Sequence, residues 1–344
     1  MEILTRKMAV KAFEIIVTIY ISIILGGTIS EANIIWSRSD PPKGEISILQ
    51  ELLTITTSGS VDYATITAEY VFINNLNREI ITDLTFPLPA YIVHSSAANH
   101  MNTDFEDFEL WVDGVYQKVH REYLALSEGV NHEDFLHNLA IKSTTFGNFQ
   151  MSDKNGNSID QLLTMNKQTL NLLTEKGLIK LVSGLPVPQW SIQKQYSWQQ
   201  NFPPQKLLKI KCQYKARVGS AKLFKTSLEH PNSQSIPDLI PGNVSSMCLS
   251  PETMKKFMEH LEKSRSNFIR VYWLEYLLRP EPSMKDPIDK FELIVEGPFK
   301  ERPKFYVSFC WDGSETKFGE AIYRAIRKQF VPDKTLTVYF CQEN

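Results

Sequence analysis

Residues 65–90 alternate apolar and polar side chains with a period of two, and this period constrains the fold more than any other feature. One face of the first strand carries Ile66, Ala68, Tyr70 and Phe72. Turn-forming residues follow at 74–77, and the alternation then resumes until Pro87 and Pro89. Because proline lacks the backbone N–H that a central ladder needs, the second strand must end there or lie at an edge. We therefore predict a β-hairpin in the core of a sheet.

The strand period recurs along most of the chain and gives way to a helical period only locally. Residues 127–184 space their leucines and isoleucines at intervals near 3.6, which favours a helical insertion. We predict a mainly β protein with a helical insertion, built from antiparallel β-sandwich-like units. The expected divisions are a signal peptide at 1–32, an N-terminal β-sandwich-like domain at 33–230, and a C-terminal β-rich domain at 231–344 with one helix at about 251–264.

The first 32 residues have the composition of an export signal. Basic residues precede the apolar run 15–25, and Ser-Glu-Ala at 30–32 places small residues at the two positions that a signal peptidase reads. The apolar run is shorter than the ~20 residues that a membrane-spanning helix needs. We expect cleavage between Ala32 and Asn33, which leaves a periplasmic or secreted chain without a membrane span. A retained anchor is the alternative.

Chain length and net charge limit the classes of protein to which this sequence can belong. The chain has 344 residues, of which 42% are hydrophobic, enough for one large domain or two ordinary ones. Its formal net charge of −2 argues against a nucleic-acid partner, because phosphates call for a basic surface. The chain has no Gly-x-Ser-x-Gly elbow and no phosphate-binding loop. We expect neither a cofactor nor a metal.

Four cysteines lie at positions 212, 248, 310 and 341. No two of them have C-x-x-C spacing, so neither a thioredoxin-like redox site nor a zinc knuckle is indicated. In an oxidising compartment they permit three full pairings. Cys212 lies on the apolar side of a strand, which favours a buried free thiol there, and the state of Cys341 stays open.

Residues 205–215 form the clearest half-buried strand, with alternate lysines on its polar side. The candidate binding face combines these lysines with nearby aromatic residues: Trp190, Trp198, Lys206, Lys209, Lys211 and Lys215. Such a face suits an anionic surface or a sugar ring. The alternatives are that the lysines only keep a sheet soluble and that the tryptophans pack in the core.

A second group of polar residues is acidic. It comprises Asp104, Glu106, Asp107 and Glu109, close to Asp113. Paired carboxylates serve calcium sites and glycoside hydrolysis, but a solvated strand edge explains the same pattern. His132 and His137 are five residues apart, whereas helical zinc sites space their histidines by four.

Several segments resemble a known family. They are the Phe-Pro-Leu-Pro motif at 86–89, Phe-Glu-Leu-Trp-Val-Asp-Gly at 108–114, Trp-Gln-Gln-Asn-Phe-Pro-Pro at 198–204, and C-terminal segments at 274–278, 287–291, 307–310 and 330–334. In this order they are similar to the bacterial domain of unknown function family numbered 4424. The resemblance implies an exported, uncharacterised envelope protein of Gram-negative bacteria, with no assigned catalytic residues. It also suggests a recurring disulfide, here Cys248 with Cys310.

These observations favour a non-catalytic binding or assembly module whose partner is an envelope protein or a glycan. The alternative is an uncharacterised hydrolase of envelope glycans or peptides that uses the acidic group at 104–109. The sequence leaves open whether any enzymatic activity exists.

Overall fold

The structure is a computed structural model. It describes residues 35–36, 44–57, 63–88, 90–92, 105–146, 165–182, 185–230, 244–263, 268–277, 287–297, 305–309, 322–331 and 335–342. The chain is mainly β with several antiparallel sheets and few helices, as predicted. The predicted cleavage site at Ala32 and Asn33 lies outside the described residues.

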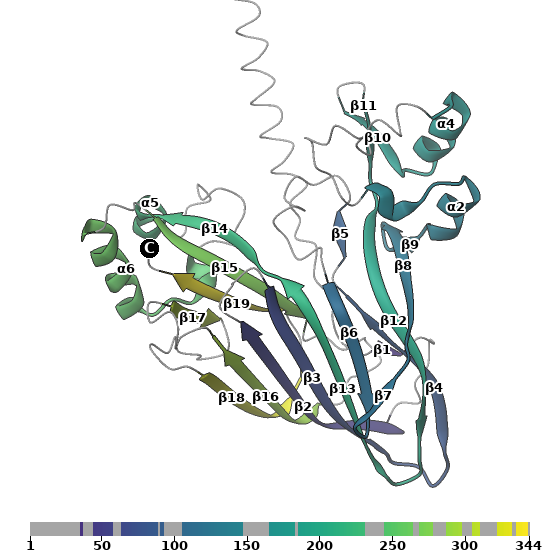
Figure 1. The fold of residues 1–344 in the computed structure, drawn as a ribbon, viewed down its shortest axis with the longest axis horizontal. Coiled ribbons are helices and arrows are strands. Elements are labelled where there is room, and N and C mark those ends of the chain that lie inside the picture. Colours follow the sequence, from purple (N-terminus) through teal and green to yellow (C-terminus); the bar gives the residue numbers. More distant parts are fainter. Residues whose placement is uncertain are drawn as a thin grey trace, which may run out of the picture.

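The large sheet contains seven strands among the described residues, in the order β18-β16-β2-β3-β13-β6-β7 (Figure 1). They are β2 (Ile46–Thr57), β3 (Tyr63–Asn74), β6 (Phe105–Val112), β7 (Val115–Gln117), β13 (Leu207–Arg217), β16 (Ile288–Glu296) and β18 (Ile322–Phe330). Neighbouring strands run antiparallel, except that β16 pairs with β2 in parallel. A hairpin turn at Asp113-Gly114 joins β6 to β7.

Two further sheets face the large one. The distal sheet comprises β1 (Ile35–Trp36), β4 (Ile80–Pro87), β12 (Ser191–Phe202), β8 (His120–Ser127) and β9 (Val130–Asn131), with β5 (Tyr91–Ile92) also paired to β12. The helix-backed sheet comprises β14 (Gly219–Phe224), β15 (Phe268–Leu277), β19 (Thr335–Gln342) and β17 (Phe305–Phe309). A small ladder joins β10 (Ile179–Val182) to β11 (Leu185–Pro188).

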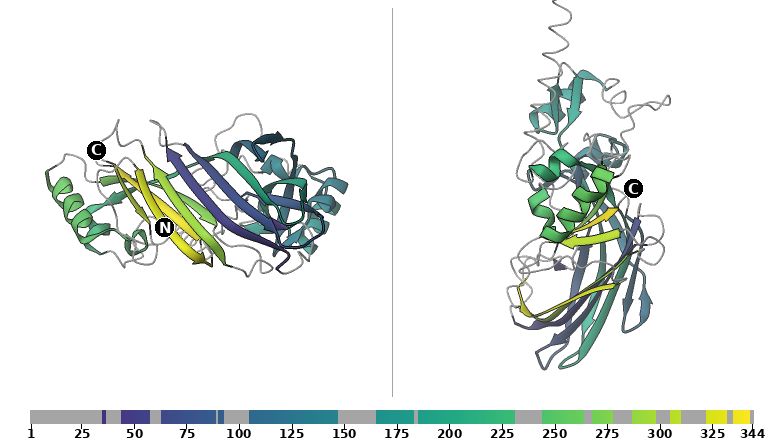
Figure 2. Two further views of the ribbon diagram at one scale, coloured as in Figure 1. Left: turned by 90° about the horizontal axis from the view of Figure 1, so that it is seen from below. Right: turned by 90° about the vertical axis from the view of Figure 1, so that its left-hand side faces the viewer.

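Helices lie at both ends of the molecule, as Figures 1 and 2 show. One group is α2 (Glu133–Asn138), the 3-10 helix η2 (Ser143–Phe146) and α4 (Lys167–Glu175), all within the predicted insertion. The other is α5 (Lys225–Glu229), the 3-10 helix η3 (Val244–Met247) and α6 (Pro251–Lys263). The Ser250 hydroxyl accepts a hydrogen bond from the Thr253 amide at 3.1 Å and so caps α6. Within the described ranges, no helix is both apolar and long enough to cross a bilayer.

The hairpin predicted at residues 65–90 is wrong, because β3 and β4 belong to different sheets. The chain between them crosses the sandwich as an arch around Asn74, whose side chain is fully buried. The Asn74 amide group donates to the carbonyls of Arg78 and Phe202 at 2.8 and 2.9 Å, and its Oδ1 accepts from the Leu76 amide. The turn residues were recognised correctly, but they turn the chain between layers.

A second arch lies beside the first and joins β12 to β13. Gln205 connects the two: its backbone amide donates to the Asn74 carbonyl at 3.1 Å, and its Nε2 donates to the Asn75 carbonyl at 2.5 Å. The two arches thus fix the distal sheet against the same part of the large sheet.

The main core lies between the inner face of the large sheet and the two sheets that face it. Aromatic rings from different sheets meet there: Phe108 stacks on Tyr196 with centroids 4.1 Å apart, and Phe86 contacts Tyr214 at 5.7 Å. The outer side of the helix-backed sheet packs under α5 and α6 around Phe257 and Trp273. The helix-backed sheet is therefore buried on both faces.

The predicted domain boundary between residues 230 and 231 falls between two segments that pack together in the structure. The C-terminal strands β16 and β18 are part of the large sheet, and the main core contains residues from both sides of the boundary. The two segments therefore share one sheet and one core.

Candidate functional site

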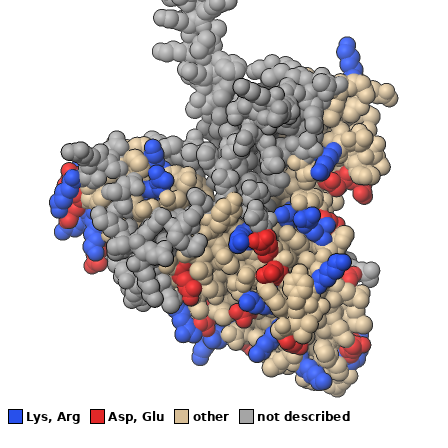
Figure 3. Space-filling view, viewed as in Figure 1, with Lys and Arg blue, Asp and Glu red and all other residues tan. Residues whose placement is uncertain are grey.

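The outer face of the large sheet carries the lysines of β13. Leu208, Ile210 and Cys212 point into the core, so Lys209 and Lys211 point outward, as the alternation predicted. Lys206 precedes the strand and is also exposed. Figure 3 shows that positive and negative side chains are interspersed over the described surface seen from this side.

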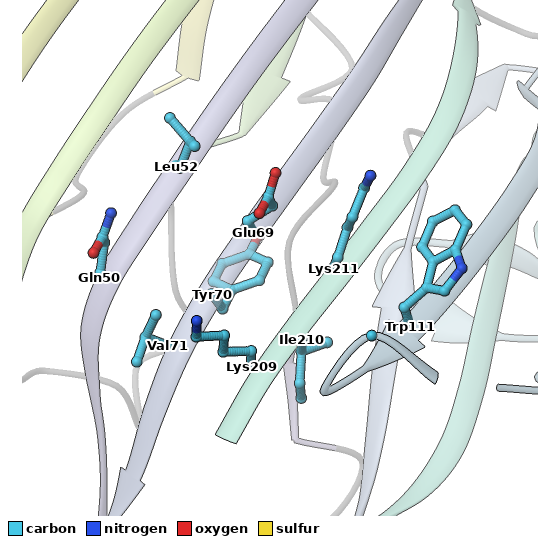
Figure 4. A pocket seen from close by; sticks show the side chains of 10 residues that line it. Gln50, Leu52, Glu69, Tyr70, Val71, Trp111, Lys209, Ile210 and Lys211 are labelled. Atoms are coloured by element: carbon cyan, nitrogen blue, oxygen red, sulfur yellow. The ribbon is translucent and has the colours of Figure 1, made fainter. Parts of the chain in front are cut away.

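A hollow of about 540 Å³ lies on this face, within the size range of ligand sites. It is lined by Gln50, Leu52, Glu69, Tyr70, Val71, Trp111, Gly114, Lys209, Ile210 and Lys211 (Figure 4). The ladder registers place Glu69 of β3, Lys211 of β13 and Trp111 of β6 side by side in one row. Four strands and one turn thus contribute to the hollow, which we call the lysine hollow.

Trp111 supplies the aromatic surface of the lysine hollow. Its indole is half-buried, with the Lys211 Nζ 4.9 Å from the ring centroid. Tyr116 packs edge-on against the ring with centroids 6.3 Å apart. A cation over an indole face is a favourable contact that also orients the ring. The sequence carried a signal for this position, since Trp111 alternates with the buried Leu110, but it was not included in the candidate face.

The turn after β6 fixes the backbone of Lys209. The Asp113 amide donates to the Lys209 carbonyl at 2.8 Å, and the Lys209 amide donates to Asp113 Oδ1 at 2.9 Å. Asp113 and Gly114 both have positive φ, 48° and 80°, as a two-residue hairpin turn requires. Asp113 is therefore a structural residue of the hairpin.

The lysines of the face differ in their partners. Lys215 pairs with Asp107 at 2.7 Å. Among the described residues, neither Lys209 nor Lys211 has a carboxylate within ion-pair distance. Two ammonium groups beside Trp111 are thus free of a carboxylate partner in the described part of the chain.

The tryptophans chosen from the sequence do not lie on this face. Trp190 is fully buried in the core beneath α2 and α4, and Trp198 is 8% exposed in the main core. The Trp198 indole N–H donates to Gln200 Oε1 at 3.3 Å. The core-packing alternative is correct for both residues, and they are removed from the candidate face.

Asp107 of the acidic group and the nearby Asp113 have separate partners. Asp107 is held by Lys215, Asp113 by its turn, and Asp104 lies outside the described residues, as does the side chain of Glu106. Within the described ranges, no three His, Cys, Asp or Glu side chains are grouped closely enough to hold a metal ion. No described geometry favours the hydrolase alternative at this group.

A buried polar cluster lies on the inner side of the large sheet. Glu51 and Tyr70 are opposite each other on β2 and β3, and Tyr276 reaches them from the helix-backed sheet. The Tyr276 hydroxyl donates to Glu51 Oε1 at 3.5 Å and lies 3.1 Å from the Tyr70 hydroxyl. Burial raises the pKa of Glu51 to about 8 and that of Tyr70 well above its usual value. These groups are enclosed by the core, so their altered pKa values are a property of packing.

The cysteines are consistent with the thiol predicted at position 212. Cys212 and Cys341 are buried free cysteines, and burial raises the pKa of both thiols, that of Cys341 to about 12. Cys248 is not among the free cysteines, but its suggested partner Cys310 lies outside the described residues. The pairing of Cys248 with Cys310 stays a prediction.

Comparison with known proteins decides the family. A family model described as "Domain of unknown function (DUF4424)" matches residues 41–339. The chain belongs to the DUF4424 family. No curated protein matches it.

Solved structures resemble this DUF4424 protein only distantly. A crystal structure of a "putative nutrient binding protein" from Legionella pneumophila is 12% identical, with 91% of this chain and 71% of that chain covered and a TM-score of 0.42. Yeast LTA4 hydrolase with bestatin is 10% identical, covers 88% and 31%, and has a TM-score of 0.31. An M1 zinc metallopeptidase from Deinococcus radiodurans is 7% identical, covers 86% and 42%, and has a TM-score of 0.29. TM-scores below 0.5 transfer no function to this chain.

Proposed function

We propose that this protein is an exported, non-catalytic binding or assembly module of the bacterial envelope. Its N-terminal signal would be removed after Ala32, and a disulfide between Cys248 and Cys310 would form after export. The proposed partner is an envelope protein or a glycan.

The lysine hollow is the observation that supports this proposal. It places a half-buried indole and two ammonium groups, neither with a carboxylate partner in the described part of the chain, on a sheet whose inner face is packed in the main core. Burial also raises the pKa values of Glu51, Tyr70, Cys212, Tyr214 and Tyr276, which lie inside the core, and that of Glu275, to about 7, which is partly exposed on β15 of the helix-backed sheet. None of these groups except Tyr70 lines the lysine hollow, whose exposed lysines and indole suit recognition.

The test is cross-linking of the tagged protein in its own envelope, followed by mass spectrometry of the captured material. Lys209→Gln with Lys211→Gln should reduce specific capture about tenfold, since hot-spot contacts of this kind carry ~1.4 kcal/mol or more. Lys167→Gln with Lys255→Gln removes the same charge from exposed helix positions outside the hollow and should leave capture unchanged.

Equal capture by both double variants, with the fold intact, would remove the lysine hollow from the proposal. Mass spectrometry of the purified chain also tests export: we expect an N-terminus at Asn33 and two free thiols.

A further inference from the structure

We propose that the lysine hollow binds an acidic saccharide, meaning linked sugar rings that carry carboxylates. This inference rests on the proposed function and specifies the ligand class of the same site. It follows from three chemical demands that the residues lining the hollow make of a ligand.

The first demand is for negative charge. Lys209 and Lys211 lie two residues apart on one strand, so their side chains leave the sheet on the same face, about 7 Å apart. Neither has a carboxylate partner among the described residues. An anionic ligand would gain charge-assisted hydrogen bonds from both ammonium groups.

The second demand is for a flat apolar surface. Tyr116 packs edge-on against Trp111, so the orientation of the ring is set before a ligand arrives. The Lys211 ammonium, 4.9 Å from the ring centroid, would move toward a bound anion and so free that face of the ring. A preorganised aromatic ring loses little conformational entropy on binding. The C–H face of a sugar ring fits such a surface, whereas a bare phosphate or carboxylate does not use it.

The third demand is for hydrogen-bond donors on the ligand. Glu69 lies directly opposite Lys211 across the β3–β13 ladder, and Gln50 lines the hollow from β2. A carboxylate accepts hydrogen bonds but repels a second anion. A ligand with hydrogen-bond donors as well as negative charge suits this lining, and the hydroxyls of an acidic saccharide supply those donors next to its carboxylates.

The volume of the hollow, about 540 Å³, accommodates a short oligosaccharide on an open face. Backbone amides of the sheet are already used in ladder bonds, so recognition falls to the side chains. Salt should weaken binding, because both ammonium groups are near the surface.

The experiment is calorimetric titration of the mature full-length protein with trigalacturonic acid. Two reference probes are maltotriose, which has three rings and no charge, and triglutamate, which has the charges and no sugar. We expect measurable binding of trigalacturonic acid and at least about tenfold weaker binding of both references, a difference of ~1.4 kcal/mol.

Variants then locate the binding. Trp111→Leu and the double change Lys209→Gln with Lys211→Gln should each weaken binding of trigalacturonic acid about tenfold or more. The Lys167→Gln, Lys255→Gln control should bind as the wild type does. Circular dichroism and the unfolding midpoint establish that each variant is folded.

Three results would overturn the inference: no binding of trigalacturonic acid, equal binding of maltotriose, or tighter binding of triglutamate. Capture in the envelope that depends on Lys209 and Lys211, together with any of these results, would retain the binding module and reject the saccharide. Binding of trigalacturonic acid that survives Trp111→Leu and the double lysine variant would place it outside the lysine hollow.

Discussion

Glu51 lies between two sheets and makes the stability of the folded protein depend on pH. Its carboxyl is 1% exposed and lies between β2 and the helix-backed sheet, hydrogen-bonded to Tyr276. Burial raises its pKa from 4.5 to about 8, so the folded protein binds a proton that the unfolded chain releases. The stabilisation is complete below pH 4.5 and is lost as the pH rises to about 8.

We expect Glu51→Gln to remove this dependence, because the amide keeps an acceptor for Tyr276 but does not titrate. Between pH 5 and 8 the wild type should lose on the order of 3 kcal/mol of unfolding free energy relative to Glu51→Gln, at ~1.4 kcal/mol per pKa unit. Urea unfolding at fixed ionic strength measures both proteins. Glu69→Gln, the same chemical substitution on the solvent side of β3, shows the effect of replacing an exposed carboxylate. Parallel profiles for wild type and Glu51→Gln would contradict the assignment.

At the scale of elements, the sequence predicts which side chains of a strand are buried better than it predicts which strands are neighbours in a sheet. The period of two in β13 correctly separates Lys209 from Ile210, because burial alone decides the face of a strand. The arch at Asn74 was misassigned, since a polar turn suits a hairpin and an interlayer crossing alike, and only contacts such as Asn74 to Phe202 distinguish them. Trp190 and Trp198 were assigned to the surface for a similar reason. Tryptophan occurs both in cores and at binding surfaces, and the residues packed around it determine which of the two it occupies.

Gly219 gives a test of packing between β14 and β15. It lies opposite Trp273 in the ladder, and a Cβ there would be 2.4 Å from the indole. Because that ring is buried under α6, Gly219→Ala should lower the unfolding free energy by about 1–3 kcal/mol. The change Ser220→Ala at the exposed neighbouring position should have little effect. Equal denaturant midpoints for the two variants would show that the sheet accommodates the methyl group.

At the scale of the whole molecule, the two ends of the chain complete each other's structure. β16 inserts between β18 and β2, and its Phe291 is in register with Glu51. β13 leads through Val218 into β14, so that consecutive strands serve two sheets. The 33–230 and 231–344 segments, which were predicted as domains from the sequence, contribute strands to the same large sheet and to the same helix-backed sheet.

We therefore expect residues 33–230 and 231–344, expressed separately, to give no cooperative unfolding transition. The first fragment would leave β2 as an open edge with its apolar inner face uncovered, which promotes aggregation. Circular dichroism and light scattering of each fragment, compared with residues 33–344, make the measurement. A monomeric 33–230 fragment with a sharp transition would show that this part folds by itself.

The pairing of β2 with β16 also constrains the order in which the strands of the large sheet can pair during synthesis. Thr56 donates a hydrogen bond to Glu296 at a sequence separation of 240 residues, so the large sheet cannot close until nearly the whole chain has been synthesised. A growing chain can pair β2 with β3 early, but the edge of β2 that faces β16 stays open for most of that time, and contacts of such long range form slowly. The late arrival of β16 thus leaves a long interval in which the nascent polypeptide has an uncovered sheet edge.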